Sequence, residues 1–264
     1  MRSPMRLLVL ALVAMLGSAH AAEWHMLPDF AERAIPQART DTSVTTGVPQ
    51  IINGVPTGDY PAVAGLLIWN ADGEALCSGT LVSRSVVLTA AHCVADDPTA
   101  IRAVFFPDGT TATPYDVVAY AIHPEFHFPT ADLALLLLEA PVVGITPAPL
   151  ADRKPRLRAQ GTIVGFGQDE LGNVGVKEMG TVRLARCPRR VPALGLPSRA
   201  LARSLCWRAR PGQQDTCHGD SGGPLLVGAA VAGVTSGGDA HCAGILSYDT
   251  SVAPFVPWIA SLLR

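Results

Sequence analysis

The segment Gly219-Asp220-Ser221-Gly222-Gly223-Pro224 sets one serine among three glycines. Glycine has no Cβ, so this composition lets the backbone and a bound molecule come close to the serine hydroxyl. Serine is a poor nucleophile until a neighbouring base removes its proton. A working site therefore requires a base, and a group that orients this base, elsewhere in the chain.

Two upstream segments supply such groups. Thr89-Ala90-Ala91-His92-Cys93 ends a predicted strand with a histidine, and Asp132-Leu133-Ala134-Leu135-Leu136 opens an apolar strand with a carboxylate. A histidine accepts a proton near neutral pH, and a buried carboxylate holds its tautomer and stabilises the imidazolium. Each residue alone also fits an ordinary role, as a core histidine, a turn cap or a loop serine. Their combination and order predict nucleophilic catalysis by Ser221.

The composition indicates a compact, turn-rich globule built from strands. The chain has 264 residues with a net charge of −2 and 48% apolar residues, which argues against disorder and against a protein that coats nucleic acid. Its 25 glycines and 22 prolines are too many for a helical bundle. Apolar residues at i, i+3, i+4 and i+7 predict one short helix over 254–263.

Two sets of about six short apolar or alternating runs predict an all-β fold. We expect two packed six-stranded antiparallel β-barrels, over about 62–140 and 155–253, followed by the short C-terminal helix. The predicted strands are 62–69, 76–82, 86–90, 101–106, 115–122, 133–138, 162–165, 177–185, 204–207, 224–227, 230–235 and 247–252.

Residues 1–21 have the pattern of a secretory signal peptide. A positively charged start precedes the apolar run 7–16 and the small-x-small sequence Ala19-His20-Ala21. The run is shorter than the roughly 20 residues that span a bilayer, so we expect a secreted protein, extracellular or periplasmic, without a stable membrane anchor. Residues 22–50 are polar and aperiodic and are predicted to be a propeptide that precedes a catalytic domain over 51–264.

The three segments resemble the signature segments of the trypsin-like serine endopeptidases with the chymotrypsin fold. The resemblance covers residues 51–264. Ile51-Ile52-Asn53-Gly54, Gly165-Phe166-Gly167 and Trp258-Ile259 resemble the family's mature N-terminus, its Gly-aromatic-Gly segment and its C-terminal helix. The resemblance implies a secreted hydrolase that acts on protein or peptide substrates, meets protein inhibitors, works as a monomer and needs no cofactor or metal.

The resemblance assigns a role to each reacting group. Ser221 would attack the scissile carbonyl, His92 would act as general base and then general acid, and Asp132 would orient His92. The backbone N–H groups of Gly219 and Ser221 would form the oxyanion hole.

The six cysteines are an even number in an exported chain, which predicts three disulfides. Cysteine count alone leaves 15 pairings open. The resemblance implies the pairs Cys77–Cys93, Cys187–Cys206 and Cys217–Cys242.

Three further residues would bind the substrate. By resemblance, Asp215 floors the primary specificity pocket, which goes with cleavage after Arg or Lys. A carboxylate in a narrow apolar pocket favours a cation, and a guanidinium can bind it with two hydrogen bonds. Gly237 resembles the glycine that leaves the pocket mouth open, and Thr235 stands where the family usually has a serine.

The sequence departs from the family around this pocket. Ser236 occupies a position that is usually aromatic, so the shelf for upstream substrate residues is weaker. The segment 242–247 is shorter than expected, which leaves open whether Gly244 or Ser247 lines the pocket. Asp249 could also intrude.

A last implied feature is activation. In the resembled mechanism, cleavage before Ile51 frees an ammonium that pairs with Asp220 and forms the pocket. Gln50 precedes Ile51 where trypsin-type precursors carry Arg or Lys, so we expect maturation by a protease of different specificity or by stepwise trimming.

Two other functions fit parts of the sequence. Gly219-x-Ser221-x-Gly223 also matches the nucleophile elbow of α/β-hydrolases, but that fold needs a helix after the serine and the order Ser–Asp–His. Pro224 and the order found here oppose it. A catalytically silent binding protein on a protease scaffold would be signalled by loss of a catalytic residue, and none is lost.

Charge is unevenly distributed along the chain. Residues 153–210 hold 13 Lys and Arg against 3 Asp and Glu, while residues 51–152 hold 2 against 11. The basic residues fall in several predicted turns, which favours ordinary solvated loops over a basic face for an anionic partner. Pro124 lies between His123 and His127 and opposes a helical zinc-binding pair.

Overall fold

The computed structural model describes residues 23–28, 51–167, 175–239, 241–242 and 244–263. The predicted signal peptide, and the predicted propeptide apart from residues 23–28, lie outside the described residues. Within the described part, no helix is both long and apolar enough to cross a membrane.

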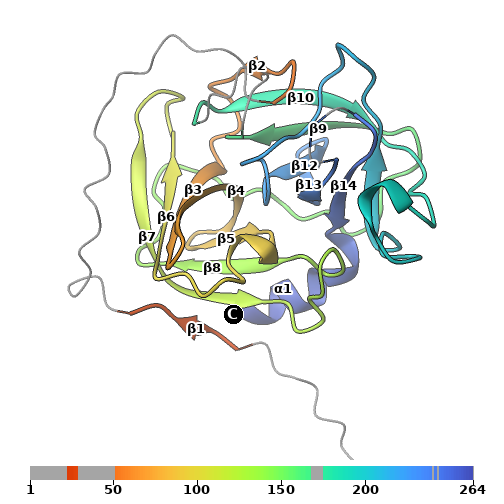
Figure 1. Cartoon of the computed structure of the whole chain (residues 1–264). Coiled ribbons are helices and arrows are strands. Elements are labelled where there is room, and N and C mark those ends of the chain that lie inside the picture. The colour runs from red at the N-terminus through yellow and green to blue at the C-terminus, as the bar shows by residue number, and fades with distance from the viewer. Residues whose placement is uncertain (1–22, 29–50, 168–174, 240, 243, 264) are drawn as a thin grey trace, which may run out of the picture.

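The first sheet is a closed antiparallel barrel of six strands (Figure 1). Its strands follow the order β7-β6-β3-β4-β5-β8, and β7 also pairs with β8, which closes the ring. The strands are β3 (Val63–Asn70), β4 (Gly73–Ser83), β5 (Val86–Thr89), β6 (Ala100–Phe105), β7 (Thr113–Ile122) and β8 (Ala134–Leu138). Each of the six strands predicted for this half overlaps one of them.

A two-residue strand that the sequence did not predict joins this barrel. β1 (His25–Met26) pairs with β7, and the side chain of Leu27 is buried against the barrel core. The ring of His25 stacks on that of Tyr120 with centroids 5.2 Å apart. The start of the segment predicted to be removable is therefore an edge strand of the first barrel.

The second sheet is less completely closed. Its order is β11-β14-β13-β12-β9-β10-β2, and a single bridge between Ala185 and Cys206 links β10 with β11. The second half is thus a half-barrel, which corrects the expectation of a second closed barrel. The strands are β2 (Val55–Pro56), β9 (Gln160–Gly165), β10 (Glu178–Arg183), β11 (Ser204–Trp207), β12 (Pro224–Val227), β13 (Ala230–Gly237) and β14 (Ser247–Ser251).

The chain between β10 and β11 is rich in proline. Pro188, Pro192 and Pro197 lie in the chain between β10 and β11. A proline has no backbone N–H to donate to a ladder, so this chain runs as a loop with one 3₁₀ turn at Pro192–Leu194.

The two sheets share a core because β8 is buried on both faces. Leu133 and Leu135 pack into the cluster that also holds Val164 and Val231 of the second sheet, while Leu136 points into the core of the first barrel. Alternate residues of a strand face opposite sides, which explains why this stretch is a continuous apolar run. Asp132 stands immediately before it, at the junction of the two sheets.

The remaining expectations about the fold are confirmed. A 3₁₀ turn at Ala253–Phe255 leads into the helix α1 (Val256–Leu262), and Phe255 and Ile259 are buried between the sheets. The fold is all-β with one short C-terminal helix. The three disulfides are Cys77–Cys93, Cys187–Cys206 and Cys217–Cys242, as the resemblance implied.

Candidate active site

Asp132 is fully buried and holds His92 in one orientation. Its Oδ1 accepts the backbone N–H of His92 at 2.9 Å, and its Oδ2 lies 2.7 Å from Nδ1 of the same residue. A carboxylate only accepts hydrogen bonds, so Nδ1 carries the proton and Nε2 is left as an acceptor. The histidine side chain is 28% exposed, which leaves its outer face open to a substrate.

The local fold explains this placement. His92 lies in a one-turn 3₁₀ helix, Ala91–Cys93, directly after β5. Backbone N–H groups at a helix start have no partner within the helix, and that of His92 binds Asp132. The disulfide from Cys93 to Cys77 ties the same turn to β4.

Ser221 lies in the turn that precedes β12, and β4 anchors this turn. The backbone N–H of Ser78 donates to the carbonyl of Ser221 at 2.7 Å, and the Ser78 hydroxyl donates to the carbonyl of Gly219 at 3.0 Å. Within the described part of the chain, the N–H groups of Gly219 and Ser221 donate no hydrogen bond. Two such free N–H groups can donate hydrogen bonds to one oxyanion.

Gly219 is required by the shape of this turn. Its φ is +91°, a backbone conformation that residues with a side chain rarely adopt. A Cβ here would also lie 2.8 Å from the Cα of Gly167. Glycine thus allows the turn to pack closely against the segment after β9.

The serine and the histidine both lie near the Cys93 sulfur. Cys93 Sγ is 4.0 Å from Nε2 of His92 and 3.7 Å from the carbonyl oxygen of Ser221. A cleft of about 570 Å³ is lined by Ser221 and by Phe128, and the Phe128 ring meets that of His92 edge-on with centroids 5.6 Å apart. Ser221 therefore lines the cleft, and His92 adjoins it through the Phe128 ring.

Asp215 lies behind the wall of this cleft. It is 1% exposed, and its neighbour Thr216 lines the cleft. Its Oδ1 accepts Trp207 Nε1 at 2.8 Å, the Ser247 hydroxyl at 2.6 Å and the Thr216 N–H at 2.9 Å. Its Oδ2 has no partner among the described residues. Burial raises the pKa of Asp215, because desolvation disfavours the charged form.

The sequence left open whether Gly244 or Ser247 lines the pocket, and neither residue lines the cleft described above. Ser247, not Gly244, contacts Asp215, and Gly244 lies against Ala209 with φ +77°. Asp249 is fully buried and does not line the cleft. Burial raises the pKa of Asp249 well above its ordinary value.

Ser236 provides a third hydrogen bond to Asp132 that the sequence did not predict. Thr235, Ser236 and Gly237 all line the cleft, as expected for Thr235 and Gly237. However, Ser236, which we placed at an aromatic shelf position, donates its hydroxyl to Asp132 Oδ2 at 2.6 Å. The register of β13 shifts between Thr235 and Gly237, and such a bulge re-aims side chains without a sequence signal.

Asp239 was also missed. It lines the cleft and is 8% exposed, and its carboxylate accepts the N–H groups of His241 and Ile245. Its negative charge helps to raise the pKa of Asp215. Its position in the segment before Cys242 gave no signal, because exposed loops commonly carry aspartates.

The structure does not bring Ile51 and Asp220 together in the uncut chain. The backbone N–H of Ile51 donates to Glu178 Oε2 at 2.7 Å. Asp220 is fully buried and accepts the N–H groups of Gly167 and Cys217, each at 2.9 Å. Burial raises the pKa of Asp220 well above its ordinary value. The ion pair stays a prediction for a chain cleaved before Ile51.

Comparison with known proteins identifies the family. Residues 51–259 match the family model described as Trypsin. The thrombin-like enzyme calobin-1 of Gloydius ussuriensis is 30% identical, covering 74% of this chain and 80% of its own. The inactive snake venom serine proteinase 13 of Crotalus adamanteus is 29% identical, covering 71% of this chain and 77% of its own.

A solved structure supports the same fold. Neuropsin, a serine protease expressed in the limbic system of mouse brain, superposes with a TM-score of 0.67 at 24% identity, covering 81% of this chain and 100% of its own. At this identity the likeness concerns the fold. Together with the family match over most of the chain, it leads to one conclusion: the chain belongs to the trypsin family of serine proteases.

Proposed function

We propose that the protein is a secreted serine endopeptidase with a trypsin-like preference for Arg or Lys before the cleaved bond. Residues 1–21 would be the signal peptide, 22–50 the propeptide and 51–264 the catalytic domain. The observation that carries the proposal is the buried Asp132 bonded to His92 Nδ1 at 2.7 Å, beside a cleft lined by Ser221.

The chemistry is an acyl transfer in two halves. Nε2 of His92 takes the proton of the Ser221 hydroxyl while Oγ attacks the substrate carbonyl. The imidazolium then gives this proton to the leaving amine, and the C–N bond breaks to leave an ester on Ser221. Water, deprotonated by the same nitrogen, attacks the ester. The bond from the acyl carbon to Oγ then breaks, the imidazolium returns its proton to Ser221, and the acid is released. Asp132 stabilises the imidazolium in both halves.

The oxyanion of each tetrahedral intermediate would be held by the N–H groups of Gly219 and Ser221. Neither has another acceptor in the described part of the chain, so both are available without breaking an existing bond. One such donor is worth roughly 2.7–4 kcal/mol of transition-state stabilisation.

The preference for a cation would come from Asp215. Three donors converge on Oδ1, and the unpartnered Oδ2 is the atom that an arginine or lysine side chain would reach. Ordering of Oδ1 by the protein fixes the carboxylate, so little side-chain freedom is lost when the substrate binds.

One alternative has a specific observation in its favour. A relative of similar identity is described as inactive, so a silent binding protein on this scaffold is the competing function. A silent binding protein would fold and bind ligands but would not hydrolyse peptides.

The test is hydrolysis of matched chromogenic peptides that end in Arg, Lys, Phe or Ala. A chain that begins at Ile51 is compared with its Ser221→Ala variant, which should lose on the order of 10⁶-fold in kcat. Turnover of Arg and Lys peptides, abolished by the substitution, supports the whole proposal. Turnover of Phe or Ala peptides keeps the protease but rejects the role of Asp215. No turnover by a folded chain favours the silent scaffold.

A further inference from the structure

A second hollow lies outside the active-site cleft, on the half-barrel. It has a volume of about 380 Å³ and lies where the chain at 154–157, the chain at 184–189 and β11 meet. The Cys187–Cys206 disulfide forms part of its wall. We call this hollow the basic groove.

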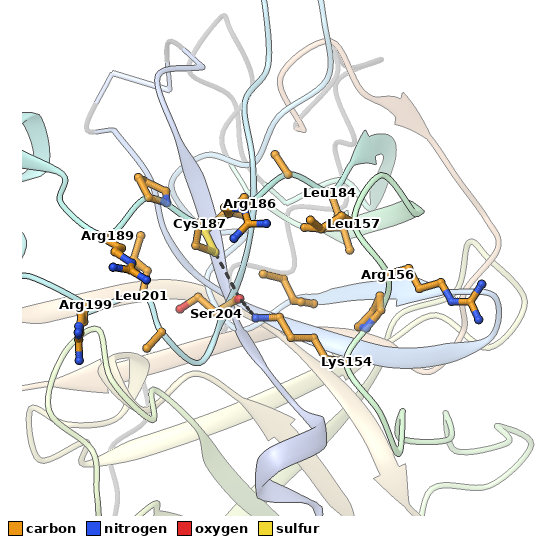
Figure 2. Close-up of a pocket in the computed structure, with 16 residues that line it drawn as sticks. Lys154, Arg156, Leu157, Leu184, Arg186, Cys187, Arg189, Arg199, Leu201 and Ser204 are labelled. Carbon is orange, nitrogen blue, oxygen red and sulfur yellow. Dashed lines mark hydrogen bonds between the residues drawn. A yellow bond between two sulfur atoms is a disulfide. The ribbon is translucent and has the colours of Figure 1, made fainter.

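Five cations line the basic groove, and no acidic residue does. In the view of Figure 2, Arg189 and Arg199 lie to the left of Ser204, and Lys154 and Arg156 lie to the right. Arg186 lies above it. Among the described residues, none of the five takes part in a salt bridge. The fold therefore gathers basic residues that looked scattered in the sequence. The five are Lys154, Arg156, Arg186, Arg189 and Arg199.

The floor of the groove is apolar. Leu184, Leu201 and Leu205 line it with their side chains buried, while Leu157 stands at the rim, 56% exposed. An apolar floor under a basic rim suits a ligand with both carboxylates and apolar side chains. This composition favours a peptide segment over a sulfated polysaccharide, which has no apolar side chains to bury.

One cation of the groove is held in place. Lys154 donates from Nζ to the carbonyl of Ser204 at 2.7 Å (Figure 2). Partial burial lowers the pKa of Lys154. Fixed donors bind with less loss of side-chain freedom than mobile ones.

The groove and the active-site cleft share one loop. The chain between Cys187 and Cys206 gives Arg189 and Arg199 to the groove, and it gives Leu194 and Leu196 to the cleft. A polypeptide bound in the cleft thus has the groove on the other side of the same loop.

We propose that the basic groove is a secondary docking site for an acidic, apolar-containing segment of the protein substrate. The assignment of the occupant to a substrate rests on the proposed function. The groove would add affinity for whole proteins that carry such a segment and would leave the hydrolysis of short peptides unchanged.

The direct test measures binding without catalysis. The full chain carrying Ser221→Ala is titrated against a fluorescein-labelled peptide of alternating Glu and Leu, followed by fluorescence anisotropy. The same peptide with Gln in place of Glu is the ligand control. We expect the Glu peptide alone to bind, and more weakly as salt is raised, because contacts between exposed charges are screened.

Charge reversal locates the site. Arg186→Glu combined with Arg189→Glu should weaken binding of the Glu peptide about ten-fold or more, since each reversal replaces attraction with repulsion. Arg190→Glu is the matched control, because Arg190 is exposed and adjacent but does not line the groove, and it should change affinity less than about two-fold. Equal binding of the Gln peptide, or equal loss in both variants, would overturn the proposal, as would binding of heparin but not of the Glu peptide.

A kinetic comparison separates this proposal from the proposed function. In the chain that begins at Ile51, the double reversal should leave kcat/KM for a short Arg peptide unchanged and should lower kcat/KM for a protein bearing an acidic segment. If short peptides are not hydrolysed at all, the proposed function fails while the anisotropy result still decides the groove. Equal loss on short and long substrates would contradict a docking site. Thermal melting of each variant checks that it is folded.

Discussion

Asp132 and Asp215 are both buried carboxylates with three hydrogen-bond donors each, but the donors are distributed differently. At Asp132 they occupy both oxygens. At Asp215 all three converge on Oδ1, and Oδ2 has no partner in the described part of the chain. A buried polar atom without a partner costs free energy, and under the proposed function a substrate cation would bind this atom.

The comparison distinguishes two roles for a buried carboxylate in this site. Asp132 has donors on both oxygens and holds another side chain, whereas under the proposed function Asp215 would be completed by a substrate. The first should control the rate of the chemical step, and the second should control which substrate is bound.

The largest effect is expected for Asp132→Asn. The amide can offer an N–H to His92, which favours the wrong tautomer and removes the charge that stabilises the imidazolium. We expect kcat to fall by about 10⁴-fold with a small change in KM. Steady-state kinetics on an Arg peptide measure both constants.

Ser236→Ala is the matched control for this substitution. It removes one donor to Asp132 but keeps the charge and the tautomer, so the loss in kcat should be about ten- to a hundred-fold. Equal losses in the two variants would show that hydrogen bonding around Asp132, not its charge, limits the rate.

A smaller and different effect is expected for Asp215→Asn. Removing one partner of a buried ion pair costs about 3–5 kcal/mol, so kcat/KM for Arg and Lys peptides should fall by roughly 10²–10³-fold. Because burial raises the pKa of Asp215, the wild-type preference for Arg should also disappear on acidification at a higher pH than for an exposed aspartate.

Asp249→Asn is the control here, since Asp249 is also buried with a raised pKa but is not the carboxylate to which the proposed function assigns the substrate cation. It should keep the preference for Arg. A loss of preference in Asp249→Asn, or its retention in Asp215→Asn, would move the specificity determinant away from Asp215.

The sequence predicted the parts of this site that depend on local pattern. The apolar run after Asp132 predicted a strand, which the structure shows to be buried on both faces, and the histidine was predicted at the end of the strand that is β5. The sequence could not predict that Ser236 would reach Asp132, because a bulge in β13 sets its direction.

Long-range assembly accounts for the other differences. In the described part of the chain, a single bridge between Ala185 and Cys206 joins the chain after β10 to β11, and how completely distant strands pair leaves no signal in the pattern of either strand. The basic groove joins residues from three separate segments, which spacing along the chain does not reveal. β1 was missed because two residues carry no measurable periodicity.

The smallest effect is expected for Asp220, a third buried carboxylate, and it concerns the pH dependence of the free energy of unfolding. In the uncut chain Asp220 has one N–H donor on each oxygen, and burial raises its pKa well above 3.8. Between pH 4 and this raised pKa, the folded chain keeps a proton that the unfolded chain releases, so stability falls as pH rises. Each such proton contributes about 1.4 kcal/mol per pH unit.

Asp220→Asn should therefore flatten the fall in stability of the uncut chain above pH 4 by up to about 1.4 kcal/mol per pH unit, as measured by denaturant unfolding in the Ser221→Ala background. In a chain that begins at Ile51, the proposed ammonium would pair with Asp220 and favour its charged form, so the contribution of Asp220 to the fall should disappear there, while those of Asp215 and Asp249 remain. An unchanged slope in uncut Asp220→Asn would mean that Asp220 is already compensated before cleavage. In that case the ammonium of Ile51 would find no unpaired carboxylate at Asp220, and activation would need another cause.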